Sequence, residues 1–259
     1  MPEGDAVRRT ARRLDAAMAG QELRQAELRV PQHATHDLTG FTVVATAVVG
    51  KHLLTRLERE GERLTLHSHL RMDGRWVTGR AGDRPCSGPS HQVRVWLNGH
   101  TAQAVGLRLM EVRLVSTSDE DTVVGHLGPD IMGDDWHVEA AATRLAEQGV
   151  RPLTETLLDQ TVISGLGTMW AAELAFQAKV DPYRPVADVP ELGAALNRIR
   201  QRMRRAVIDD PRASRARLNV FERTGRPCLR CGTPVRSGRV GQPPRDRITY
   251  WCPTCQSGR

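Results

Sequence analysis

The sequence contains few aromatic residues, few lysines and few cysteines, and it has no long apolar run. Aromatic residues make up only 4% of its 259 residues, so a folded core must rest on leucine, valine, isoleucine and alanine. No apolar stretch approaches the roughly 20 residues that a membrane-spanning helix needs. The polar start of the chain is also unlike a signal peptide. We therefore expect a cytoplasmic protein that does not insert into a membrane.

Charge is abundant, and it is unevenly spread. The 37 basic residues exceed the 30 acidic residues, which gives a formal net charge of +7. The segment from Arg198 to Arg259 holds 16 arginines against four acidic residues. Such a focused basic region favours a polyanionic partner, because each neutralised phosphate releases condensed counterions. A solvated charged surface is the alternative interpretation.

Hydrophobic periodicity predicts a leading helix, a β-rich half and then a helical half. Residues 5–19 place apolar side chains on one helical face, and Asp5 is a candidate N-cap. Alternating patterns predict strands over 23–30, 42–49, 52–57, 63–70, 92–97 and 107–115. A period near 3.6 predicts helices over 136–148, 153–163, 168–179 and 190–208. The turn-rich residues 79–91 are expected to form a mobile loop.

The last predicted helix is amphipathic. Its apolar stripe consists of Leu192, Leu196, Ile199, Met203 and Val207. Arg198, Arg202 and Arg205 fall off this stripe and are expected to face outward.

Four of the five cysteines form two pairs with metal-ligand spacing. Cys228 and Cys231 are separated from Cys252 and Cys255 by 20 residues, whereas Cys86 stands alone. Two such pairs with a hairpin between them are typical of one structural zinc ion held by four thiolates. Free thiols or a redox pair are the alternatives. Gly232 and Gly238 are expected to permit the turns of this module.

Four motifs occur in order and together resemble the formamidopyrimidine-DNA glycosylase/endonuclease VIII family. They are MPEGD at 1–5, GKHLL at 50–54, LDQ leading to ISGLG over 158–167, and YWCPTCQ at 250–256. The resemblance covers essentially the whole chain. It implies an α+β fold with three parts: an N-terminal β-sandwich domain with a leading helix, a helical helix–two-turn–helix domain, and a zinc finger β-hairpin. Their expected bounds are 1–118, 119–218 and 219–259.

The resemblance also implies an activity in base excision repair. Members of the family are bifunctional DNA glycosylases and abasic-site lyases that act on damaged double-stranded DNA, and we expect a monomer associated with a bacterial nucleoid. Removal of Met1 would expose the secondary amine of Pro2, which attacks the sugar C1′ and forms a Schiff base. Glu3 would move protons during ring opening and the β- and δ-eliminations that follow. Without this resemblance, the alternative interpretation is that Pro2 and Glu3 occur at the start of the chain by chance.

Two basic residues are expected to hold phosphates near the reacting sugar. Lys51 is one of only two lysines in the chain, which indicates a position that needs an ammonium group. It matches a family lysine that contacts DNA and assists catalysis. Arg247 matches a phosphate-gripping arginine of the zinc hairpin. A solvated turn lysine and one more surface arginine are the respective alternatives.

The turn around Gly165 and Gly167 resembles the DNA-binding turn of the family. Its glycines allow close approach of the backbone, and the N–H groups that open the following helix can bind a phosphate. Thr168 stands where the family usually has asparagine, and it can cap the helix. Glu173 matches a glutamate that supports the active site, or it is simply an exposed helix residue.

Residues that read the lesion are harder to assign. Met72 is a candidate for filling the gap left by a flipped base, with a core methionine as the alternative. The stretch 102–106 is expected to correspond to the second intercalating loop, and it lacks the arginine and aromatic residue that the family carries there. His67 and His69 share one strand face. No nearby carboxylate or third histidine completes a metal site in the sequence, so we expect structural or DNA-facing histidines.

The substrate class is argued from the segment before the zinc module. Residues 209–218 form a short connector, which is more typical of endonuclease VIII than of the purine-directed branch. We therefore expect removal of oxidised bases, pyrimidines above all, and cleavage at abasic sites. A non-catalytic protein that senses lesions on the same scaffold is the second hypothesis. A zinc-ribbon transcription or RNA-processing factor is the third.

Overall fold

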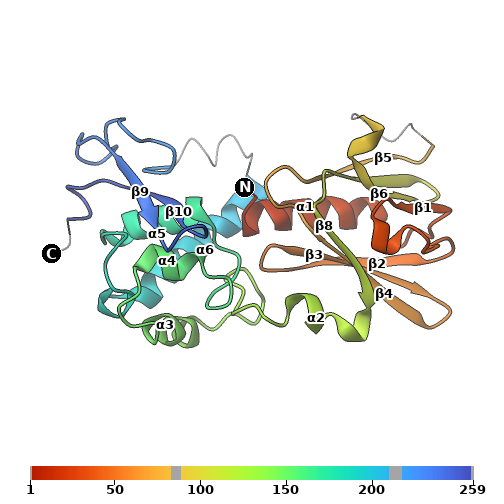
Figure 1. The fold of residues 1–259 in the computed structure, drawn as a ribbon, viewed down its shortest axis with the longest axis horizontal. Helices are drawn as coiled ribbons and strands as arrows, with labels where there is room; N and C mark the ends of the chain where they lie inside the picture. Colours follow the sequence, from red (N-terminus) through yellow and green to blue (C-terminus); the bar gives the residue numbers. More distant parts are fainter. Residues whose placement is uncertain (1, 83–88, 210–217, 258–259) are drawn as a thin grey trace. The chain divides into compact units, whose positions relative to one another are not determined.

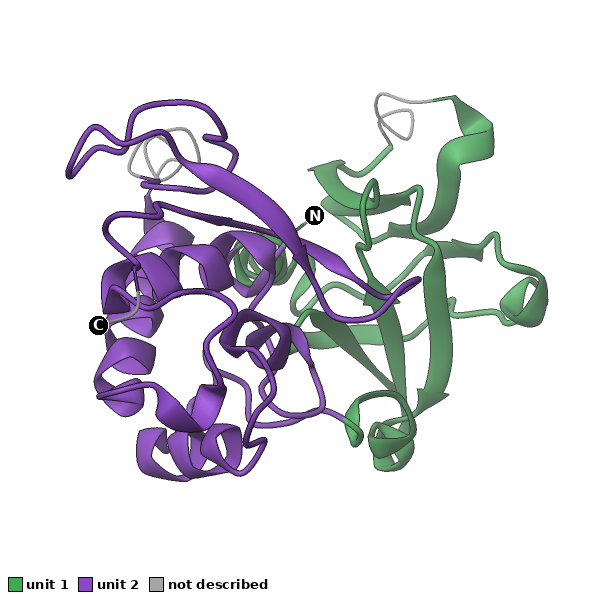
Figure 2. Cartoon of the chain, turned by 60° about the vertical axis from the view of Figure 1, so that its left-hand side comes forward, with its two compact units in different colours: residues 1–2, 6–126 green, residues 3–5, 127–259 purple. Residues whose placement is uncertain are grey.

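A computed structural model describes residues 2–82, 89–209 and 218–257 of the chain (Figure 1). Met1, Cys86, the centre of the predicted loop 79–91 and most of the connector 209–218 lie outside the described residues. The chain divides into two compact units. The first comprises residues 1–2 and 6–126, and the second comprises residues 3–5 and 127–259 (Figure 2).

The first unit is built from two four-stranded antiparallel sheets. One sheet has the order β1-β6-β7-β5, with bounds Gln25–Leu28, Val93–Asn98, Ala102–Leu107 and Arg75–Arg80. The other has the order β2-β3-β4-β8, with bounds Thr42–Val49, His52–Arg59, Glu62–His69 and Glu111–Ser116. Helix α1 spans Gly4–Met18, and its apolar face packs in the core with both sheets through Val7, Ala11, Leu14 and Met18. The short helix α2 spans Asp121–Val124. Single 3-10 turns lie at Pro31–His33, Ser90–Gln92 and Thr117–Asp119.

Alternation of polar and apolar residues did not predict two strands of this unit, β5 and β7. Strand β7 is buried along nearly its whole length and pairs on both sides, with β5 and with β6. A strand buried on both faces shows no polar–apolar alternation. The stretch 102–106, predicted to be an intercalating loop, therefore forms most of this strand, and that prediction is wrong. Strand β5 was also not predicted.

The second unit is helical with a C-terminal hairpin. Its helices are α3 at Val138–Ala146, α4 at Leu153–Leu158, α5 at Thr168–Ala178 and α6 at Leu192–Ile208. A 3-10 turn lies at Val186–Asp188, and the hairpin strands are β9 at Arg236–Val240 and β10 at Arg247–Trp251. The predicted apolar stripe of α6 is buried from Leu192 to Met203, and Val207 packs against the same core. Arg198 and Arg205 are exposed as expected, whereas Arg202 turns toward α5, as described below. The predicted α+β class, with a β-sandwich, a helical part and a cysteine-bearing hairpin, is thus confirmed.

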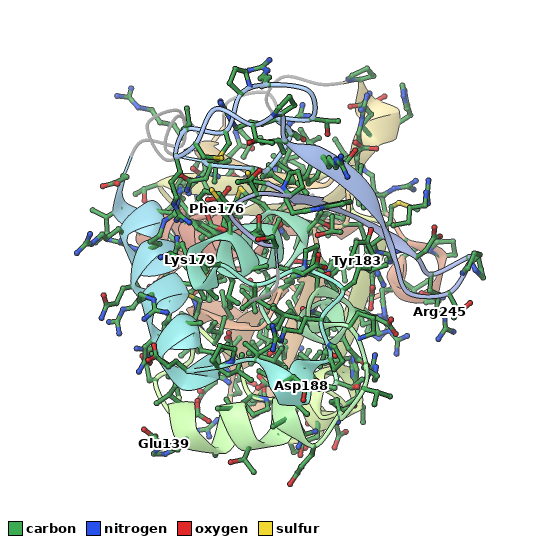
Figure 3. All side chains as sticks on the ribbon, turned by 90° about the vertical axis from the view of Figure 1, so that its left-hand side faces the viewer. Glu139, Phe176, Lys179, Tyr183, Asp188 and Arg245 are labelled. Atoms are coloured by element: carbon green, nitrogen blue, oxygen red, sulfur yellow. The ribbon has the colours of Figure 1, made fainter. Side chains whose placement is uncertain are left out.

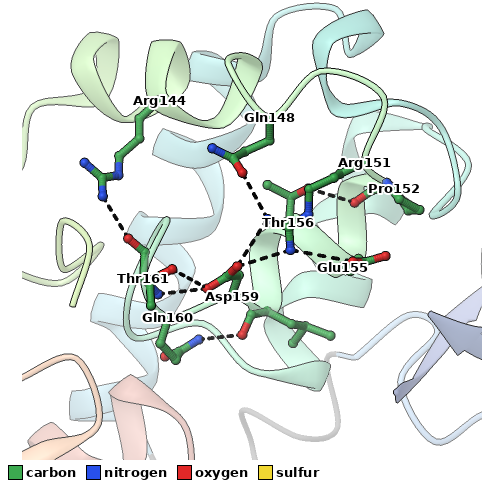
Figure 4. A network of polar contacts seen from close by, with 10 residues as sticks. Arg144, Gln148, Arg151, Pro152, Glu155, Thr156, Asp159, Gln160 and Thr161 are labelled. Carbon is green, nitrogen blue, oxygen red and sulfur yellow. Dashed lines mark hydrogen bonds and ion pairs between the residues drawn. The ribbon is translucent and has the colours of Figure 1, made fainter. Parts of the chain in front are cut away.

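Helix α4 ends five residues earlier than its sequence pattern predicts. The Asp159 carboxylate accepts hydrogen bonds from the amide and hydroxyl of Thr161, at 3.0 and 2.7 Å. Such local bonds compete with helix continuation. Arg151 donates to the other oxygen of Asp159 and fixes the turn (Figure 4). No helix in the described part of the chain is long and apolar enough to cross a membrane.

Candidate functional site

The Glu3 carboxylate lies at the N-terminal end of helix α5. Its side chain is buried, and it accepts hydrogen bonds from the amides of Met169 at 2.7 Å, Gly167 at 2.8 Å and Trp170 at 3.2 Å. The first amides of a helix have no partner within the helix, and the helix dipole favours negative charge there. The carboxylate that follows Pro2 is therefore held at a fixed position by α5.

This arrangement changes the expected role of the turn at 165–168. Gly167, not Thr168, is the N-cap of α5, and Thr168 is the first helical residue, so the expectation of a threonine cap is wrong. An added Cβ at Gly167 would overlap the Glu3 carboxylate, which explains the glycine. Gly165 adopts φ +94°, a conformation that favours glycine, and its carbonyl accepts from the amide of Gly4 at 2.9 Å. The helix-opening amides that were expected to bind a phosphate are occupied by the protein's own carboxylate.

Asp5 is not the N-cap of α1, because that helix already begins at Gly4. Instead the Asp5 carboxylate accepts a hydrogen bond from the indole nitrogen of Trp170 at 2.9 Å, and both side chains are buried. Gln160 shapes the same turn from the other side. Its amide donates to the carbonyls of Leu158 and Leu166 at 3.0 Å each, and its oxygen accepts from the amide of Gly165. The LDQ and glycine motifs therefore build one turn.

Glu173 is completely buried in α5, so the exposed-residue alternative is wrong. One carboxylate oxygen accepts from the amides of Asn219 at 2.8 Å, Val220 at 2.9 Å and Phe221 at 3.3 Å. The other accepts from the side-chain amide of Asn219 at 2.8 Å and from Arg202 at 3.2 Å. Glu173 thereby anchors the segment that leads into the cysteine module, and it explains why Arg202 does not face outward.

The four cysteines predicted as metal ligands lie together. The sulfur atoms of Cys231 and Cys252 are 3.5 Å apart, and those of Cys228 and Cys255 are 4.0 Å apart. Thiolates at about 2.3 Å from a tetrahedral zinc ion lie roughly 3.8 Å from one another. The donor set therefore fits a metal ion.

The cysteine module packs on α5. Phe176 of α5 contacts the buried side chains of the module, and the guanidinium of Arg230 stacks over its ring at 4.2 Å. Gln256 is fully buried; it accepts from the amide of Cys252 and donates to the Val180 carbonyl, at 2.8 and 2.9 Å. Gly238 was expected to permit a turn, but it lies within β9. A side chain there would collide with the Tyr183 hydroxyl.

Arg247 is the exposed first residue of β10. Its guanidinium donates to the carbonyls of Arg245 and Asp246, at 3.1 Å each. Asp246 in turn pairs with Arg239 across the hairpin at 2.6 Å. Arg245 lies at the far end of the hairpin (Figure 3). The hairpin tip is therefore a basic surface.

Lys51 forms the turn between β2 and β3 together with Gly50, because Val49 pairs directly with His52. The lysine is buried, with 6% of its surface exposed, so the solvated-turn alternative is wrong. Glycine suits the preceding position, where φ is +58°.

Met72 is 66% exposed in the turn between β4 and β5, which excludes the core alternative. A second methionine in the same unit, Met110, is 81% exposed in the turn between β7 and β8. An ion pair between Arg71 and Glu111 at 2.5 Å joins these two turns. Arg108 precedes Met110 in the second turn and adopts φ +52°. Sequence reasoning missed this turn because β7 was mistaken for it. The signal available was an arginine and a methionine two residues apart between two strands.

The expectation that no carboxylate or third histidine approaches His67 and His69 is wrong. The Nδ1 atom of His52 lies 2.8 Å from Nε2 of His67, and the His69 ring packs edge-on against His52. Glu111 completes a potential ligand group with His52 and His67. His52 and His67 lie on the consecutive strands β3 and β4, whereas Glu111 lies on β8, far along the chain, so the sheet register brings the three residues together.

Comparison with known proteins identifies the chain's relatives. Residues 1–128 match the model of the formamidopyrimidine-DNA glycosylase N-terminal domain, and residues 127–217 match that of the formamidopyrimidine-DNA glycosylase H2TH domain. A Streptomyces coelicolor protein named "Probable endonuclease 8 2" is 46% identical over 100% of this chain and 95% of its own length. The Mycolicibacterium smegmatis "DNA-(apurinic or apyrimidinic site) lyase Nei2" is 37% identical over 99% of both chains.

Solved structures share the fold. The crystal structure of a complex between the Lactococcus lactis Fpg and an abasic site containing DNA aligns with a TM-score of 0.81 and 23% identity. The alignment covers 98% of this chain and 99% of that one. Together, the two family models and the full-length relatives show that the chain belongs to the formamidopyrimidine-DNA glycosylase/endonuclease VIII family.

Proposed function

We propose that the chain is a bifunctional DNA glycosylase and abasic-site lyase that uses Pro2 as its nucleophile. The observation that carries the proposal is the Glu3 carboxylate, which α5 holds immediately beside Pro2 at the start of the chain. A carboxylate fixed by three amides needs no reorganisation when charge develops next to it.

The residues then act in sequence. After removal of Met1, the lone pair of the Pro2 nitrogen forms a bond to C1′, and the bond between C1′ and the damaged base breaks. The Glu3 carboxylate accepts the proton that the Pro2 nitrogen loses and passes it to O4′, which opens the sugar ring and leaves an iminium ion on Pro2. The iminium acidifies the C2′ proton, so its removal expels the 3′ phosphate. A further elimination expels the 5′ phosphate.

Contacts to DNA would come from groups in both units. Lys51 and Arg247 are proposed to hold phosphates, and the turn at Gly165–Thr168 is proposed to approach the backbone. Met72 is the proposed wedge for the gap left by the flipped base. Met110 adds a second exposed apolar side chain to that wedge, and Arg108 adds a cation beside it. Glu173 supports the site by anchoring the cysteine module.

A structural zinc ion is proposed for the four cysteines. With four thiolate ligands the metal would have no open coordination position, so it would stabilise the module and would not take part in the reaction. Cys252 and Cys228 are both buried in the small core that rests on Phe176, so loss of the ion would loosen this core and move Arg247.

Oxidised pyrimidines in double-stranded DNA are the proposed substrates, with abasic sites as substrates of the lyase. The names endonuclease 8 and abasic-site lyase among the full-length relatives support this class. We also propose that the protein acts as a monomer at the bacterial nucleoid.

Borohydride trapping on an abasic duplex tests the nucleophile. The mature chain should form a covalent adduct, and Pro2→Gly should weaken trapping strongly. A variant that retains Met1 should abolish it, because its amine is displaced by one residue. Pro31→Gly, at the start of a remote 3-10 turn, is the matched control and should trap normally. Full trapping by the Met1-blocked protein would refute the mechanism.

A panel of duplexes tests the substrate class. We expect cleavage of thymine glycol and dihydrouracil to exceed cleavage of 8-oxoguanine. The reverse order would reassign the substrate to purines. Salt-dependent binding with no cleavage of any duplex would support the lesion-sensing hypothesis instead.

A further inference from the structure

The first unit contains a cluster of buried histidines that the proposed reaction does not use. His52 on β3 pairs with His69 on β4, and His67 lies two residues along β4 on the same face. Glu111 on β8 stands opposite His69, so its side chain reaches this face as well. His52, His67 and His69 are all at most 9% exposed. Burying three polar rings costs free energy unless each has a partner, so the cluster calls for a physical reason.

We propose that His52, His67 and Glu111 form a second metal site for a divalent transition metal ion such as Zn²⁺. One ring nitrogen of His52, one of His67 and a Glu111 carboxylate oxygen all lie within 4.8 Å of one another, and Nδ1 of His52 lies 2.8 Å from Nε2 of His67. Two imidazoles and one carboxylate are a ligand set that such ions accept, with a further position left for water.

The protonation states of these groups suit metal binding. Burial lowers the pKa of His52 to about 3 and the pKa of His67 to about 4, so both rings are neutral at pH 7 and offer lone pairs. Burial acts to raise the pKa of Glu111, but its bond and ion pair with Arg71 outweigh this and keep the pKa below its usual value. Nδ1 of His52 and Nε2 of His67 share one hydrogen across 2.8 Å, so metal binding at both atoms requires only that this hydrogen move to the other nitrogen of its own ring.

Hydrogen bonds around the cluster distinguish ligands from supporting residues. The amide of Arg71 donates to Nδ1 of His69 at 2.9 Å, so the proton of neutral His69 is on Nε2 and the ring serves as a donor rather than a ligand. The Arg71 guanidinium holds one oxygen of Glu111 and leaves the second available. Hydrogen-bonded carboxylate ligands of this kind are common around protein metal ions.

Metal content of the full chain tests the proposal. Protein saturated with Zn²⁺ and then desalted should contain two equivalents, one for the cysteine site and one for the histidine site. Glu111→Gln and His52→Gln should each contain one. Arg71→Gln breaks the same ion pair but leaves the ligands, so it should retain two equivalents with a dissociation constant raised about tenfold. His100→Gln, an exposed histidine in another turn, should match the wild type.

Cobalt spectroscopy separates the two sites without relying on enzyme activity. Co²⁺ in the cysteine site gives intense sulfur-to-metal charge-transfer absorption, whereas Co²⁺ bound by nitrogen and oxygen gives only weak ligand-field bands. We expect a second set of weak bands in the wild type that Glu111→Gln abolishes while the charge-transfer band persists. A single equivalent in the wild type, or a second equivalent that Glu111→Gln and His52→Gln both retain, would overturn the proposal.

Discussion

Carboxylates that are wholly or partly buried are stabilised differently in the two units. In the helical unit, Glu3 and Glu173 accept hydrogen bonds mainly from backbone amides. In the sheet unit, Glu111 and Glu120 pair with arginines instead, Arg71 and Arg56. Sheet ladders use the backbone amides of their strands, whereas helix N-termini and irregular segments leave amides free. A carboxylate placed on amides is fixed by the fold, and one placed on a long arginine is fixed by a side chain that can move.

Glu173→Ala should produce the largest effect, because it removes the acceptor of several buried donors at once. We expect the free energy of unfolding to fall by about 3–5 kcal/mol, since the amides that donate to Glu173 lose their acceptor and Arg202 loses this ion pair. Urea unfolding monitored by tryptophan fluorescence measures this free energy of unfolding. Glu147→Ala, exposed at the end of α3, should change stability by less than about 0.5 kcal/mol. Equal effects of the two variants would mean that the amide cradle contributes nothing.

Gly167→Ala tests the amide cradle of Glu3. Its backbone is extended, with φ −132°, so alanine is tolerated there, and only the overlap with the Glu3 carboxylate matters. We expect a loss of about 1–3 kcal/mol together with reduced trapping on an abasic duplex. Gly193→Ala is the control, because its Cβ would meet Val138 at an ordinary 3.6 Å. Normal trapping by Gly167→Ala would separate the position of Glu3 from catalysis.

Glu120→Gln tests a carboxylate of the arginine-held kind. Bonds from Arg56 and Thr65 hold the pKa of Glu120 below its usual value. A carboxyl group with a lowered folded-state pKa contributes stability above its unfolded pKa of about 4.5 and loses it as the pH falls through the lowered value. We expect the free energy of unfolding of the wild type to exceed that of the variant by only roughly 1 kcal/mol at pH 7, because the Arg56 side chain is substantially exposed and solvent screens the pair. Thermal unfolding should show that this difference in stability shrinks between pH 7 and pH 3. A difference that stays constant would contradict the conclusion that the ionised Glu120 carboxylate stabilises the fold.

Glu58→Gln should have the smallest effect. The carboxylate pairs with Arg63 at 3.3 Å, and both side chains are largely exposed to solvent. An exposed pair of this kind contributes less than about 0.5 kcal/mol, and salt screens it. At low salt the wild type should be slightly more stable to unfolding than Glu58→Gln, and in 1 M salt this difference should disappear. A larger effect would show that a carboxylate paired with an arginine stabilises this unit even when both side chains are exposed.

Features that depend on residues close together in the chain could be predicted from the sequence, and contacts between distant segments could not. The cysteine ligands were predicted because each pair is local, with two residues between Cys228 and Cys231 and between Cys252 and Cys255. Helices α5 and α6 were predicted for the same reason, since their apolar spacing lies within one segment. The approach of Glu111 to His52 depends on the registers of β3, β4 and β8, which no local pattern encodes. The Glu3 cradle was missed as well, because it joins residues more than 160 positions apart.

The termini of the predicted elements show a second limit. Asp159 ends α4 through its own side-chain bonds, although the apolar pattern continues to Ile163. Strand β7 was not recognised because burial of both faces removes alternation, and this error also concealed the turn that carries Met110. A pattern reports which face is buried, and it is silent where both faces or neither face is buried.

The two exposed methionines, Met72 and Met110, carry a consequence for oxidative stress. Thioethers open to solvent are converted to sulfoxides, which are polar and chiral, and a polar group fills a gap in a base stack poorly. The conditions that create oxidised bases would therefore blunt the wedge of the protein proposed to remove them. Because methionine sulfoxide reductases reverse this damage, the repair capacity of the protein would depend on the reducing power of its cell.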